Sequence, residues 1–129
     1  MTDDAPKFQT KPGKALGLRH TVASAGYSFL GFKRLLGETA FRQELIALVV
    51  LLVLFAGRGV AIGSYATQIT LALVLFAVEA LNTAIEVLVD RISPDYAEFA
   101  GHAKDLGSFA VFCLLAANLV HAVAVLWTA

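Results

Sequence analysis

Long apolar stretches alternate with short polar segments along this chain. Residues 45–56 are twelve apolar residues in succession, and a second apolar stretch covers about residues 65–89. The last stretch, residues 106–129, contains no Lys, Arg, Asp or Glu. Because about 20 helical residues cross a bilayer, the pattern predicts three transmembrane helices. Their predicted spans are about residues 43–63, 65–89 and 106–128.

Glycine, proline and charge mark the predicted ends of these helices. The first span ends near residues 57–59, or continues to about Gly63 if the Arg58 side chain snorkels to the membrane surface. The glycines at 57, 59 and 63 fit no phosphate-binding spacing and are assigned to a short turn. Pro94 disfavours further helix after the second span, so a water-exposed loop is expected over residues 90–105.

Residues 17–37 precede the first span and are predicted to form an amphipathic helix. Apolar residues recur there in steps of three and four, while basic residues lie mostly off that stripe. Such a helix can lie in the membrane interface, against anionic head groups. Residues 1–16 hold scattered charges but no apolar core, so we expect a flexible tail without a signal peptide. The predicted fold is an all-α membrane protein in which this surface helix and three transmembrane helices form one domain, residues 17–129.

Composition and charge support a membrane protein and indicate its orientation. Hydrophobic residues make up 58% of the chain, and the mean hydropathy is +0.74, above the level of soluble proteins. Ten basic and ten acidic residues cancel, so net charge indicates no nucleic-acid partner. Nine of the ten basic residues fall on one side of the predicted spans. By the positive-inside rule, the N-terminus and the 90–105 loop are cytoplasmic, and the C-terminus lies outside.

A polar stripe interrupts the later half of the second span. At about 100° per residue, Glu79, Asn82, Glu86 and Asp90 share one helix face over roughly 16 Å. No Lys or Arg lies between them, so the carboxylates would repel one another unless a cation or protons sat among them. This pattern favours a divalent metal or a catalytic carboxylate pair. The alternative is a protonated, hydrogen-bonded packing motif between helices.

The predicted topology also brings charged residues to one membrane surface. They are Glu38, Glu44, Glu86, Asp90, Lys104 and Asp105. Carboxylates for Mg²⁺, a cation for phosphate oxygens and a further carboxylate as base are the groups needed to handle a metal–nucleotide. Glu79, the deepest acid, would be desolvated, which suits a base that accepts a proton from a lipid hydroxyl. An ion or proton carrier would use a buried Glu stripe as well.

Two polar residues, Asn118 and His121, lie within the third predicted span. Their side chains need hydrogen-bond partners in an apolar surrounding. We expect these residues to hydrogen-bond between helices rather than to bind a ligand.

Three motifs resemble those of the prokaryotic diacylglycerol kinase family. Members of this family are small trimeric lipid kinases of the membrane. The motifs are Glu38-x-Ala40-Phe41-Arg42-Gln43-Glu44, then Glu79-x-Leu81-Asn82-Thr83-Ala84-Ile85-Glu86 followed by Val89-Asp90-Arg91, and Ala103-Lys104-Asp105-x-Gly107-Ser108. The resemblance covers about residues 17–127. It implies direct transfer of the γ-phosphate of ATP, with Mg²⁺, to the free hydroxyl of diacylglycerol. The product would be phosphatidic acid, and the enzyme a homotrimer in the bacterial inner membrane whose protomers share the active sites.

The same resemblance implies roles for individual residues. Glu79 matches the general base, and Glu38 and Glu86 match ligands of the catalytic metal. The residues that match nucleotide-binding positions are His20, Tyr27, Glu38, Glu86, Asp95, Tyr96, Glu98, Lys104 and Asp105. The residues that match positions bordering or shaping the site are Arg19, Ala25, Gln43, Glu44, Asn82, Asp90 and Ser108. His20, with Arg19 beside it, stands where the family usually has a phosphate-contacting arginine.

Two alternative functions stay open. A related branch that phosphorylates undecaprenol shares the acidic stripe and the Ala-Lys-Asp motif, although residues 41–44 and 90–91 resemble the diacylglycerol branch more closely. A non-enzymatic ion or proton carrier would explain Glu79 and Glu86. It leaves the surface helix and the Lys104-Asp105 pair without a task.

Overall fold

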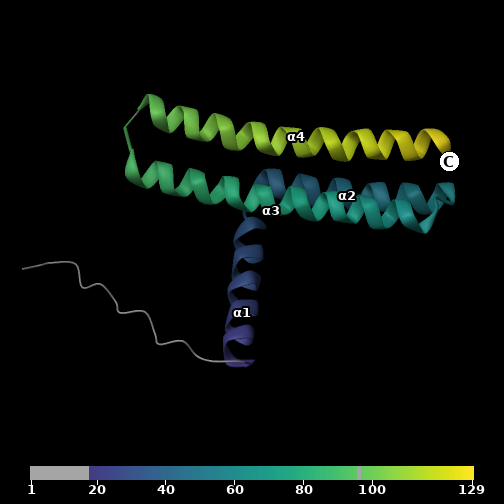
Figure 1. The fold of residues 1–129 in the computed structure, drawn as a ribbon, viewed down its shortest axis with the longest axis horizontal. Helices are drawn as coiled ribbons and strands as arrows, with labels where there is room; N and C mark the ends of the chain where they lie inside the picture. The colour runs from purple at the N-terminus through teal and green to yellow at the C-terminus, as the bar shows by residue number, and fades with distance from the viewer. Residues whose placement is uncertain (1–17, 96) are drawn as a thin grey trace, which may run out of the picture. The chain divides into compact units, whose positions relative to one another are not determined.

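Four helices make up the computed structural model, which describes residues 18–95 and 97–129 (Figure 1). They are α1 (Leu18–Leu35), α2 (Thr39–Arg58), α3 (Ile62–Ile92) and α4 (Glu98–Thr128). The described residues contain no strand. Helices α2, α3 and α4 are each long and apolar enough to cross a membrane. The predicted all-α membrane fold with three such helices is therefore confirmed.

The described chain divides into two units, one that ends at residue 33 and one that comprises residues 34–129. The first unit contains most of α1, an 18-residue helix with apolar residues at amphipathic spacing. Its bounds agree with the predicted surface helix over residues 17–37. The predicted tail, residues 1–16, lies outside the described residues. The second unit contains the three long helices.

Helix α2 is about as long as the apolar core of a bilayer is thick, and both of its ends have a local cause. Its 20 residues extend about 30 Å at about 1.5 Å per residue. Glu38 precedes it in an extended conformation, with φ −81° and ψ 133°. Gly59 ends it with φ +64°, a left-handed conformation that glycine adopts readily. The helix therefore stops at Arg58, the earlier of the two predicted endings, and a short turn leads into α3.

The predicted loop over residues 90–105 is wrong in most of its length. Helix α4 begins earlier than expected, so residues 93–97 alone connect it to α3. Ala97 is extended, with φ −138° and ψ 140°, and the helix starts directly after it. Residues 98–105 carry four polar side chains but no proline, so their polarity marks exposure rather than irregular backbone. Lys104 and Asp105 consequently lie on a helix.

Helices α3 and α4 lie side by side and antiparallel, and α2 runs along them (Figure 1). Two phenylalanines anchor α2. Phe41 is buried, and its ring meets that of Phe76 edge-on, with 5.0 Å between ring centroids. Phe55 is buried against Tyr65 of α3, at 5.5 Å, and against His121 of α4, at 6.5 Å. These edge-to-face contacts hold α2 beside the helix pair near both of its ends.

An amide–histidine network, formed by Gln68, Asn118 and His121, joins α3 to α4. The Gln68 amide nitrogen donates a hydrogen bond to Asn118 Oδ1 at 2.8 Å, and Gln68 Oε1 lies 2.8 Å from His121 Nδ1. The Asn118 amide nitrogen donates to the carbonyl oxygens of Leu114 at 2.9 Å and Leu71 at 3.3 Å. The predicted interhelical hydrogen bonding of Asn118 and His121 is therefore confirmed. Their partner Gln68 is almost fully buried and was not identified from the sequence.

Candidate active site

The face of α3 that carries Glu79, Asn82, Glu86 and Asp90 runs from the interior of the helix bundle to an exposed end. Glu79 and Asn82 are 6% and 9% exposed. Glu86 is half-buried, and the Asp90 side chain is 64% exposed. Leu88, which lies off this face, is largely exposed. The predicted stripe is therefore one continuous face whose access to solvent rises toward the end of the helix.

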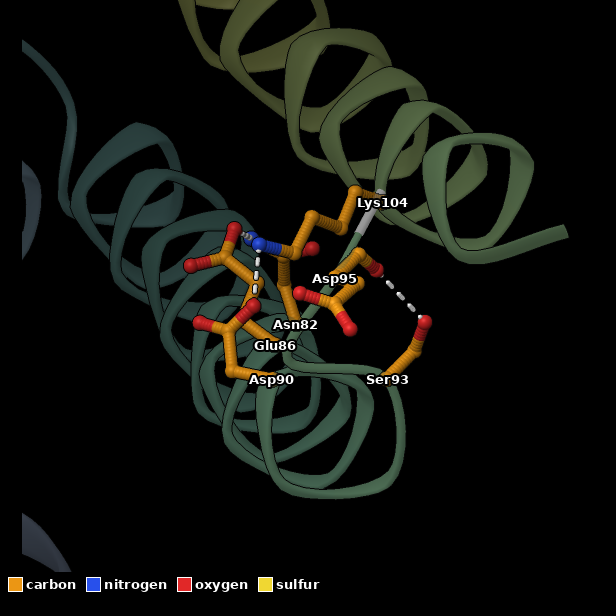
Figure 2. A network of polar contacts seen from close by, with 6 residues as sticks. All are labelled: Asn82, Glu86, Asp90, Ser93, Asp95 and Lys104. Atoms are coloured by element: carbon orange, nitrogen blue, oxygen red, sulfur yellow. Dashed lines mark hydrogen bonds and ion pairs between the residues drawn. The ribbon is translucent and has the colours of Figure 1, made fainter. Parts of the chain in front are cut away.

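Helix α4 adds a cation at the exposed end of this stripe (Figure 2). Lys104 reaches across from α4, and its Nζ lies 2.5 Å from Asp90 Oδ1. Lys104 also interacts electrostatically with Glu86. The side-chain amide of Asn82 donates a hydrogen bond to Glu86 Oε1 at 3.0 Å. One positive charge and two oriented carboxylates thus share the open end of the α3–α4 interface.

The start of α2 brings two more carboxylates toward Glu79. Glu38 is exposed directly before the helix, and Glu44 is half-buried in its second turn. The charges of Glu86 and Glu38 act on Glu79, and the charge of Glu79 acts on Glu44. Among the described atoms, Glu44 Oε2 is buried without a hydrogen-bond partner. We refer to Glu38, Glu44, Glu79, Glu86 and Asp90 as the acidic cluster.

Such a cluster is costly for a fold, which makes it a candidate for chemistry. Buried carboxylates close to one another lose hydration and repel when ionised. Groups of this kind gather at functional sites, where protons or cations are handled. Glu79 is buried and the Asp90 end is open to solvent, so one helix face could contact an apolar molecule at its buried end and a water-soluble molecule at its exposed end.

The donor set of the acidic cluster suits Mg²⁺ in company with phosphates. Within residues 18–95 and 97–129, no group of three or more His, Cys, Asp or Glu side chains could hold a metal ion by itself. Mg²⁺ usually takes one or two carboxylates together with phosphate oxygens. Glu86 offers such a carboxylate, and its hydrogen bond with Asn82 holds it in orientation. The arrangement therefore fits a metal–nucleotide better than a resident metal centre.

The other predicted site residues are exposed on the described helices or lie outside the described part of the chain. Exposed on α2, on α4 or in the connection before α4 are Gln43, Asp95, Glu98, Asp105 and Ser108. Glu98 pairs with His102 one turn later, at 3.9 Å. Ala25 and Tyr27 are exposed on α1, in the first unit. The side chains of Arg19 and His20, and the whole of Tyr96, lie outside the described residues.

One residue that sequence analysis treated only as part of a motif touches the stripe directly. Gly107 of α4 lies against the Asn82 side chain. Its position in the Ala103–Ser108 motif gives no sign of this contact, because no spacing along one helix predicts which residue of another helix it meets.

Comparison with known proteins shows what the chain is related to. The family model for prokaryotic diacylglycerol kinase matches residues 26–126. The chain belongs to this family. It is 50% identical over 115 residues to a diacylglycerol kinase of Sinorhizobium sp, covering 88% of this chain and 84% of that protein. It is 34% identical over 113 residues to a diacylglycerol kinase of Escherichia coli strain K12, covering 87% and 93%.

A third relative gives the same result at intermediate similarity. The chain is 40% identical over 100 residues to a diacylglycerol kinase of Pseudomonas aeruginosa, covering 77% of this chain and 81% of that protein. The family match takes in α2, α3, nearly all of α4 and the later part of α1. The predicted membership of the prokaryotic diacylglycerol kinase family is therefore confirmed, and it includes the whole acidic cluster.

Proposed function

We propose that the protein is a membrane lipid kinase that transfers the γ-phosphate of ATP directly to the free hydroxyl of diacylglycerol, giving phosphatidic acid and ADP. The family of the chain supports an enzyme of this class. The observation that carries the proposal is the stripe on α3, which leads from the buried Glu79 to the exposed Asp90 beside Lys104. A lipid hydroxyl and a soluble nucleotide would meet along such a face.

Glu79 is the proposed general base. Its carboxylate accepts the proton of the lipid hydroxyl as that oxygen bonds to the γ-phosphorus and the bond from the γ-phosphorus to the bridging oxygen of ADP breaks. The hydroxyl of a diacylglycerol lies near the head-group region of the bilayer, so a base for it belongs at the depth of the membrane rather than in open water. The burial of Glu79 within a membrane-spanning helix supports this role.

Glu86 and Glu38 are the proposed ligands of the Mg²⁺ that accompanies ATP. Bound Mg²⁺ would neutralise charge that develops on the phosphate oxygens. Asn82 orients the Glu86 carboxylate for this task. Lys104 would contact phosphate oxygens from the side of α4, exchanging its ion pair with Asp90 for the nucleotide.

The rest of the nucleotide site and the assembly are proposals from the family resemblance. Proposed nucleotide contacts come from His20, Tyr27, Asp95, Tyr96, Glu98 and Asp105, and the domain would comprise residues 17–129. The N-terminus and the α3–α4 connection would lie on the cytoplasmic side. A homotrimer would place α1 and α4 of one protomer beside α3 of another.

The decisive experiment measures phosphate transfer from labelled Mg²⁺-ATP by the purified protein in mixed micelles. Diacylglycerol and undecaprenol are offered separately, and a Glu79→Gln variant is the control. We expect label in phosphatidic acid, lost in the variant. Preferential labelling of undecaprenol would assign the chain to the related branch, and no transfer to either lipid would reject the kinase function.

A further inference from the structure

Gly107 of α4 packs directly against Asn82 of the acidic stripe. A Cβ atom built at Gly107 would overlap Asn82 Oδ1 and would lie only 3.2 Å from Asn82 Cγ. Gly101, six residues earlier on the same helix, has open space at the same position, with nothing within 4 Å. The bare backbone at Gly107 is therefore required by its neighbour rather than by the conformation of α4.

The contact acts on a side chain that has little freedom. Asn82 is buried, and its amide nitrogen is engaged by Glu86 Oε1. Its Oδ1 is buried and has no conventional hydrogen-bond partner among the described atoms. The α-hydrogen that replaces a Cβ at Gly107 points toward this oxygen. That is the arrangement of the Cα–H···O contacts that recur between closely packed helices.

We infer that Gly107 is a positioning residue of the active site: it gives Asn82 the space to hold the Glu86 carboxylate in one orientation. This inference rests on the proposed function of Glu86 as a ligand of Mg²⁺-ATP. A methyl group at position 107 would push the Asn82 amide aside or part α3 from α4. Either movement would release Glu86 from its hydrogen bond. A misplacement of about 1 Å at a reacting centre is enough to slow an enzyme severely.

The test is a double-mutant cycle between Gly107→Ala and Asn82→Ala, with Gly101→Ala as the matched control on the same helix. Asn82→Ala removes the Oδ1 and Cγ atoms that a methyl group would strike, and leaves only Asn82 Cβ, at an ordinary 3.8 Å. We expect Gly107→Ala alone to lower kcat/KM for Mg²⁺-ATP about tenfold or more, and to raise the Mg²⁺ concentration needed for half-maximal rate. In the Asn82→Ala background the same substitution should change kcat/KM by less than about twofold. Gly101→Ala should match the parent protein.

Two results would overturn the inference. One is a wild-type Mg²⁺ requirement and rate in Gly107→Ala. The other is a loss in Gly107→Ala that is equally large with and without the Asn82 side chain, since that would mean general loosening of the helix pair. The thermal unfolding midpoint of the four proteins of the cycle and of the Gly101→Ala control is measured in parallel, and the same non-additivity within the cycle is expected there. Because this second readout needs no turnover, an inactive parent protein would reject the kinase function while leaving the cycle interpretable.

Discussion

The three long helices carry two polar regions whose buried groups differ in how fully they are hydrogen-bonded. In the amide–histidine network, Gln68, Asn118 and His121 present uncharged amides and an imidazole, and the side-chain amide nitrogens of Gln68 and Asn118 all have acceptors. In the acidic cluster, the charges of the carboxylates act on one another, and Glu44 retains a buried oxygen without a described partner. A satisfied network stabilises a membrane helix pair, whereas an incomplete one costs stability. The comparison indicates that the amide–histidine network joins the helices, and the incomplete acidic cluster fits the proposed substrate site.

The largest expected effect comes from Glu79→Gln, which keeps the size of the side chain and removes the base. Phosphate transfer should fall about 10²–10⁴-fold, because proton transfer from the acceptor hydroxyl is lost. The thermal unfolding midpoint should stay the same or rise, since a buried like-charge repulsion is relieved. Near-parental turnover in this variant would remove Glu79 from the mechanism.

The reverse exchange at the other polar region, Gln68→Glu, is the matched control for that variant. It introduces a carboxylate beside Asn118 Oδ1, which can no longer receive a hydrogen bond from residue 68 when that group is ionised. We expect a lower unfolding midpoint, with the folded fraction turning over at the parental rate. If Gln68→Glu instead abolished turnover in protein shown to be folded, the functional contrast between the two regions would be wrong.

Glu86→Gln should have the next largest effect, confined to the use of Mg²⁺-ATP. Replacing a carboxylate ligand by an amide weakens metal binding, by an expected tenfold or so. The measurement is the rate as a function of Mg²⁺ at fixed ATP. Partial recovery at excess Mg²⁺ is expected for a ligand, and a loss that Mg²⁺ leaves unchanged would exclude that role.

Gln68→Leu tests how much the amide–histidine network contributes to the free energy of unfolding. The change strands Asn118 Oδ1 and the His121 ring, and should reduce the free energy of unfolding by about 1–2 kcal/mol in detergent. Replacing all three network residues by leucine should recover most of this loss, because no polar group is then left unpaired. A triple variant less stable than the single one would argue that the network does more than join two helices.

The smallest effect on stability is expected from Lys104→Met. Its ion pair with Asp90 is largely exposed, and exposed pairs contribute little to folding. The unfolding midpoint should hardly move, while KM for ATP rises because a phosphate-contacting cation is gone. The two quantities are measured on the same preparation. A marked drop in the unfolding midpoint with unchanged KM would make Lys104 a structural residue.

The local features of this molecule follow from the sequence, and the contacts between helices largely do not. Helical periodicity places Glu79, Asn82 and Glu86 on one face whatever the helix packs against, so the stripe could be predicted. The early start of α4 could not be predicted, because polar residues at a membrane surface occur in exposed helix as well as in loops. Gln68 and Gly107 were missed for a shared reason. Their partners lie on another helix, and the periodicity of one helix does not determine which residues of a neighbouring helix it contacts.

The length of α3 has a consequence for how the two substrates meet. Its 31 residues extend about 46 Å, well beyond the roughly 30 Å of hydrocarbon in a bilayer. The stripe occupies the later half of this helix, with Glu79 buried and Asp90 exposed to solvent. In the proposed reaction, this one helix face would reach from the hydrocarbon of the bilayer to the aqueous phase. The apolar acceptor could stay in the bilayer and the charged phosphate donor in water, and neither would have to leave its phase for the reaction to occur.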